Sequence, residues 1–136
     1  MANKKINLQC LYRMIYLHQE RFIMTKSEVV SRIVASVEKH IDCIDKTVNT
    51  KVALNNATFA LTEKINSIYN TRDIKELGSN AEIRNAKISV ETVAETKNVL
   101  DLENQLEIAR AEEAKAKANV DQIRYIVRVL EANIEE

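Results

Sequence analysis

The sequence has almost none of the residues that interrupt helices. Its 136 residues include no proline and a single glycine, Gly78. Because proline and glycine most often end or bend a helix, their scarcity predicts long, uninterrupted helices. Tryptophan is also absent and phenylalanine occurs only twice, so an apolar core must consist of Leu, Ile, Val and Ala. These absences predict an all-α protein with a thin, elongated core.

The same scarcity argues against catalysis. A single glycine leaves no room for a glycine-rich phosphate loop or a dinucleotide-binding turn. The two histidines, His18 and His40, lie in no motif that would activate a nucleophile. His40 and Cys43 share a helical face at i and i+3, but only Cys10 and His18 remain to complete a metal site, and no spacing brings them there. We therefore expect no enzymatic activity, no cofactor and no metal.

Charge and cysteine content bound the environment of the chain. The chain has 20 Lys and Arg residues and 20 Asp and Glu residues, so its net charge is zero. The net charge is +3 in residues 1–24 and −4 in residues 78–136. Two cysteines are too few for a disulfide framework, which favours a reducing compartment. The apolar residues 6–17 are interrupted by Gln9 and Arg13, so they predict neither a signal peptide nor a membrane span. We expect a cytoplasmic protein that does not enter a membrane.

The first long helix is expected to begin at a capping box. Thr25 and Glu28 have the spacing at which a hydroxyl and a carboxylate satisfy free N–H groups of a first helical turn. Apolar residues then recur at steps of three and four, which predicts one buried helical face: Val30, Val34, Val37, Ile41, Ile44, Val48 and Val52. Further on the apolar positions shift sideways around the helix, to Leu54, Ala57, Leu61, Ile65 and Ile68.

A connection that reverses the chain is expected between about residues 70 and 89. Gly78 should end the first helix, because glycine alone adopts positive φ without steric cost. Ser79 and Glu82 form a second possible capping box, which would begin a short helix. Thr92 and Glu95 form a third, which would begin the last helix.

The last helix contains a heptad pattern. Eleven residues follow one another at alternating steps of three and four: Val99, Leu102, Leu106, Ala109, Glu113, Ala116, Val120, Ile123, Val127, Leu130 and Ile134. We call this set the C-terminal seam, and it predicts left-handed coiled-coil packing. Ala109 and Ala116 on either side of Glu113 would allow a partner helix to approach closely. Glu113 either fixes the register or lies near solvent, and the pattern does not choose between these.

Together these patterns predict two long antiparallel helices, a helical hairpin, with short N-terminal and connecting helices. Each long helix would cover a little over 40 residues, or roughly 60 Å. We divide the chain into a basic amphipathic segment, residues 1–24, and a hairpin domain, residues 25–136. A hairpin would leave Leu54, Leu61 and Ile68 without a partner, so we expect a homo-oligomer, most simply a dimer, or cover from the N-terminal segment.

A few side chains are candidates for contact with a partner or with nucleic acid. Arg124, Tyr125 and Arg128 combine positive charge with an aromatic ring that could stack on a base. Arg13 and Tyr16 offer the same combination in the N-terminal segment. Acidic neighbours along the last helix favour instead a solvated, ion-paired face.

Two features between residues 78 and 130 form a recognisable combination. The sequence GSNAEIRNAKI from Gly78 contains an N-A-E-x-R-x-A turn, and charged, alanine-rich heptads follow it and end in the basic element from Ile123 to Leu130. In this combination the chain resembles the small helical proteins of tailed bacteriophages and prophages. The resemblance implies a viral, early-region gene among genes for recombination and single-strand annealing, expressed in a bacterial cell. It implies no established activity.

Three functions fit this description. The leading hypothesis is a non-catalytic protein that binds a nucleic-acid-handling protein, either as an inhibitor of a host nuclease or CRISPR complex or as a recombination accessory. The alternatives are direct binding of single-stranded nucleic acid, and a structural scaffold or assembly chaperone. All three expect a binding surface rather than an active site.

Overall fold

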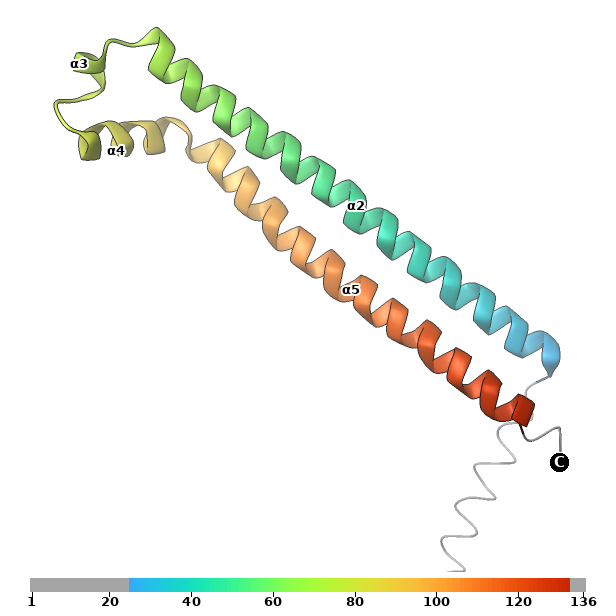
Figure 1. Ribbon diagram of the computed structural model, residues 1–136. Helices are drawn as coiled ribbons and strands as arrows, with labels where there is room; N and C mark the ends of the chain where they lie inside the picture. The colour runs from blue at the N-terminus through green and yellow to red at the C-terminus, as the bar shows by residue number, and fades with distance from the viewer. Residues whose placement is uncertain (1–24, 133–136) are drawn as a thin grey trace, which may run out of the picture. The chain divides into compact units, whose positions relative to one another are not determined.

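The computed structural model describes residues 25–132, and these residues are helical almost throughout, with no strand among them (Figure 1). The helices in this range are α2 (Lys26–Thr71), α3 (Ile74–Leu77), α4 (Ala81–Glu91) and α5 (Val93–Ala132). The expected all-α fold is confirmed. The predictions for residues 1–24, including Arg13 and Tyr16, lie outside the described residues. The chain divides into two compact units between Ala35 and Ser36, within α2.

From Ser36 onward, α2 runs antiparallel to α5 (Figure 1). Two ion pairs fix the alignment: Lys46 Nζ lies 2.6 Å from Glu112 Oε2, and Lys64 Nζ lies 2.6 Å from Glu95 Oε1. Advancing 18 residues along α2 therefore moves the partner 17 residues back along α5. This is the register of an antiparallel helical hairpin, as the sequence predicts.

The start of α2 is the expected capping box. The Thr25 backbone N–H donates to Glu28 Oε2 at 2.7 Å, and the Glu28 N–H donates to Thr25 Oγ1 at 3.2 Å. The first of these bonds holds the pKa of the Glu28 carboxyl below its usual value. Two N–H groups that have no partner within the helix are thereby satisfied.

The end of α2 differs from the prediction, because the helix stops at Thr71 rather than just before Gly78. A separate short helix, α3, occupies part of the interval, and the Asp73 carboxylate accepts from the Lys75 N–H at its start, with 3.4 Å between the atoms. Asp favours such caps over helix interiors because its short side chain competes for nearby backbone N–H groups. The cap therefore divides what the apolar pattern suggested was one helix.

The second and third capping boxes are also wrong in detail. Asn80, not Ser79, caps α4, and its Oδ1 accepts from the Ile83 N–H at 2.9 Å. The buried Thr92 hydroxyl donates backward to the Ile88 carbonyl at 2.8 Å instead of capping α5. Glu95, expected to complete the third box, pairs with a lysine of α2.

The turn region between α2 and α5 is held by a small apolar cluster. Ile68, Leu77 and Ile88 are buried together, with Ile65 packed against them. Gly78 follows directly with φ 135° and ψ 158°, a conformation that is essentially restricted to glycine. A Cβ at Gly78 would lie 2.4 Å from Cγ2 of Ile83, so the position also lacks space for a side chain.

Candidate protein-binding surface

The face of α2 that lies toward α5 is polar along half of its length. Half-buried or buried side chains of α2 recur at steps of three and four: Ser36, His40, Cys43, Thr47, Thr50, Leu54, Ala57, Leu61, Ile65 and Ile68. Two of the hydroxyls bond to the helix itself, since Thr47 donates to the Cys43 carbonyl at 3.0 Å and Thr50 to the Lys46 carbonyl at 2.8 Å. Back-bonding of this kind lets a threonine pack against another helix without leaving its hydroxyl unsatisfied.

The C-terminal seam of α5 supplies the opposite side of the contact between α2 and α5. Leu106, Ala109, Ala116 and Val120 are buried. Leu130 is exposed, and Ile134 lies outside the described residues. The remaining members are half-buried: Val99, Leu102, Glu113, Ile123 and Val127. The Lys46–Glu112 pair places the two alanines across from the small side chains of α2. Small residues on both sides let the helices approach closely, which compensates for the modest apolar content of this face of α2.

The apolar face that the sequence predicted to be buried in α2 is exposed instead. We call five of its members the valine–isoleucine stripe, and each is between 37 and 52% exposed: Val37, Ile41, Ile44, Val48 and Val52. Val30 and Val34, which continue the same spacing toward the start of α2, are exposed as well. The prediction was wrong because it assigned the most apolar face of α2 to the hairpin interior. In the structure that interior uses Thr, Ser, Cys and His.

The residues predicted to lack a partner are the ones that have one. Leu54 and Leu61 are half-buried and Ile68 is buried, all on the face of α2 toward α5. The sideways shift of the apolar positions along the sequence therefore marks the place where the hairpin contact becomes apolar. It does not mark a change of partner.

Charged side chains border the valine–isoleucine stripe unequally. Glu38 and Asp45 are exposed, and each follows a stripe residue by one position on the flank that faces away from α5. The opposite flank holds His40, which is half-buried toward α5. The stripe thus has one acidic border and one border next to α5.

The ion pairs between the helices stabilise the register and are partly exposed, although Oε2 of Glu95 is buried and has no hydrogen-bond partner among the described residues. The hydrogen bond from Lys46 lowers the pKa of the Glu112 carboxyl and raises the pKa of the Lys46 ammonium. A hydrogen bond from Lys64 likewise lowers the pKa of Glu95. Arg72 and Glu91 form a third pair near the turn. Exposed pairs of this kind contribute little to stability singly and mainly favour one alignment.

The candidate nucleic-acid contacts on α5 are exposed but partly neutralised. Tyr125 is 68% exposed between Arg124 and Arg128, which are also exposed. Asp121 lies 3.9 Å from Arg124. Nearer the middle of α5, Arg110 and Glu107 form another pair, at 2.7 Å. The structure brings the two arginines and the tyrosine together at one end of α5, beside acidic neighbours.

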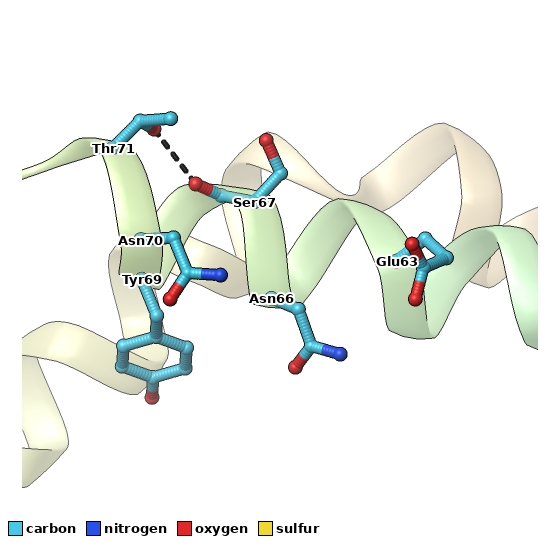
Figure 2. Close-up of a pocket in the computed structure, with 6 residues that line it drawn as sticks. All are labelled: Glu63, Asn66, Ser67, Tyr69, Asn70 and Thr71. Atoms are coloured by element: carbon cyan, nitrogen blue, oxygen red, sulfur yellow. Dashed lines mark hydrogen bonds between the residues drawn. The ribbon is translucent and has the colours of Figure 1, made fainter.

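A shallow pocket lies near the end of α2 (Figure 2). Its lining consists of exposed side chains from a single helix: Glu63, Asn66, Ser67, Tyr69, Asn70 and Thr71. The Thr71 hydroxyl donates to the Ser67 carbonyl at 2.7 Å, as Figure 2 shows. The lining is therefore a polar depression on the surface of one helix.

Among residues 25–132, no three His, Cys, Asp or Glu side chains gather closely enough to hold a metal ion. The helices described in this range also contain no stretch with the length and hydropathy needed to cross a membrane.

The valine–isoleucine stripe, an apolar face of one helix, is therefore the candidate binding surface. Sequence patterning did identify the stripe residues, but it assigned them to the core. The signal that could have corrected the assignment is the second pattern on α2, from Ser36 to Ile68, whose polar members conceal the same spacing. Comparison with models of protein families, with curated proteins and with solved structures found no match.

Proposed function

We propose that this protein is a non-catalytic interaction protein that acts by binding other proteins through the valine–isoleucine stripe. The observation that carries the proposal is the exposure of five β-branched residues along one face of α2. Their combined exposed area is on the order of 400 Å², which is within the range of the largest apolar patch on a soluble monomer, and such patches are often functional.

The biological setting follows from the resemblance of residues 78–130 to small phage proteins. In that setting, the protein acts in the bacterial cytoplasm and its function depends on a protein that handles nucleic acid. It either inhibits a host nuclease or CRISPR complex or assists phage recombination. A long, rigid hairpin suits both roles, because each requires occupying a surface rather than performing chemistry.

The test is affinity capture from host and infected-cell lysates, followed by binding to the purified partner. Ile41→Glu places a charge in the middle of the stripe and should abolish binding. Ile108→Glu is the matched control, because Ile108 is 58% exposed on α5 and lies outside the C-terminal seam. The control should bind like the wild-type protein. Recovery of no nucleic-acid enzyme, together with no effect on nuclease or CRISPR activity, would remove this proposal.

A second candidate function is direct binding of single-stranded nucleic acid. The exposed ring of Tyr125 between Arg124 and Arg128 favours it, because a base can stack on the ring while the arginines contact phosphates. Binding of this kind weakens steeply as salt rises, since phosphate contacts release counterions. A gel-shift series with Tyr125→Ala beside the wild-type protein tests it. The absence of a complex at low salt would eliminate it.

A further inference from the structure

We infer that a second copy of this chain covers the valine–isoleucine stripe, with the two α2 helices packed in parallel to make a four-helix bundle. This inference rests on the proposed function, because it names the first partner of the same surface. The assembled bundle, rather than the stripe of a single chain, would then engage the further protein of the proposed function, and Ile41→Glu would abolish that binding by dissociating the bundle.

The spacing of the stripe is that of a helix-pairing surface. From Val37 to Val48 the stripe residues follow one another at steps of four, three and four, the spacing of a and d positions in a coiled coil. Phe59, which is 66% exposed, follows Val52 by one heptad. A surface that bound an irregular loop would not need this repeat. A surface that binds a straight helix of similar length does need this repeat, because contacts must recur once per helical turn.

A second copy provides a matching surface of the required size. The stripe exposes on the order of 400 Å² in each chain, so the pairing removes about 800 Å² from these side chains alone. Phe59, exposed further along the same helix, adds roughly 250 Å² over the two copies, so the total is about 1,000 Å², the lower limit for a specific interface. The self-complementary pairing needs no other component.

The charges beside the stripe favour the parallel orientation. Antiparallel pairing brings like flanks together, so Glu38 and Asp45 of both copies would face one another. Parallel pairing brings this acidic flank against the opposite flank of the partner, which holds His40 and adjoins α5. Like charges repel across such a contact, so the parallel arrangement avoids a cost that the antiparallel one incurs.

Two chains, rather than three or four, fit the geometry of the hairpin. Each α2 already packs against α5 on one side from Ser36 onward. A parallel trimer around the stripe would require two further neighbours for each α2. The α5 helix occupies the side on which one of them would pack.

Sedimentation equilibrium on the full chain, from about 1 to 100 μM, tests the inference. The wild-type protein should have a mass of two 15.5 kDa chains. Ile41→Glu should have the mass of one chain, with helical content retained by circular dichroism, and the Ile108→Glu control should remain a dimer. Val48→Glu, as a second variant, should match Ile41→Glu.

Cysteine cross-linking tests the orientation, with Cys10 and Cys43 replaced by alanine. In a parallel dimer Val37→Cys lies beside itself and should form an interchain disulfide under mild oxidation. In an antiparallel dimer Val37→Cys would cross-link with Val52→Cys from another chain instead, which would overturn the parallel arrangement.

Each remaining outcome has a defined meaning. A single-chain mass for the wild-type protein, a mass of three or more chains, or a dimer that survives both glutamate variants would overturn the inference. A wild-type monomer that binds another protein, and loses it on Ile41→Glu, would overturn the dimer while leaving the proposed function standing.

Discussion

Replacing Leu106 with alanine should destabilise the hairpin more than any other single truncation in α5. Leu106 is 6% exposed and lies on the face of α5 that contacts α2. The change removes three carbon atoms, about 0.8 kcal/mol each, so the transfer term alone is about 2.5 kcal/mol. The cavity adds to this, and partial collapse of a two-helix contact limits the addition, giving an expected loss of about 2.5 to 4 kcal/mol.

Urea unfolding followed by circular dichroism measures this loss, with all proteins compared at one concentration because self-association changes apparent stability. The matched control is Leu100→Ala on the same helix, where Leu100 is 53% exposed. The control should cost less than about 0.5 kcal/mol, as surface substitutions do. Equal losses for the two variants would refute the assignment of Leu106 to the helix contact.

Four further perturbations test other parts of the structure. Gly78→Ala should cost about 1 to 3 kcal/mol, measured by urea unfolding, because φ 135° strains alanine and its Cβ would meet Ile83. Ala116→Leu should cost about 1 to 3 kcal/mol by overpacking the 2%-exposed site, and an unchanged melting temperature would contradict the close approach. The lowered pKa of Glu112 should stabilise the fold above the unfolded-state value of about 4.3 and lose that contribution as pH falls through the folded value, so Glu112→Gln should flatten the acid limb of a melting-temperature profile. The raised pKa of Lys46 should stabilise the fold below the unfolded-state value of about 10.4, and this contribution should be lost as pH rises through the folded value. Lys46→Met should therefore flatten the alkaline limb of the same profile.

Helix content and chain reversal could be predicted from the sequence because they depend on local rules. The near absence of glycine and proline predicted long helices, and the Thr25–Glu28 box predicted where α2 begins. Ala109 and Ala116 were expected to allow a close helix contact, and both are buried. The helix content and the start of α2 depend on neighbouring residues, and the close contact depends on the spacing of small residues along one helix.

The choice of face on α2 could not be predicted by counting apolar residues. A pattern scan assigns Thr47 and Thr50 to solvent, because it does not register that their hydroxyls bond to carbonyls one turn earlier. It also assigns Val48 to the core, because it assumes that the chain buries its own most apolar face. The register decided by Lys46 and Glu112 depends on tertiary structure.

The most direct test of this account asks which face of α2 lies against α5, using two double-cysteine variants in a background without Cys10 and Cys43. Thr50 and Val48 lie at nearly the same level as Ala109 in the register but on different faces of α2. Thr50→Cys with Ala109→Cys should close an intrachain disulfide under mild oxidation, measured by mass spectrometry after alkylation, because a disulfide requires Cα atoms within about 7 Å. Val48→Cys with Ala109→Cys should remain reduced within the chain. Closure of the Val48 pair with no closure of the Thr50 pair would place the valine–isoleucine stripe inside the hairpin and contradict the account.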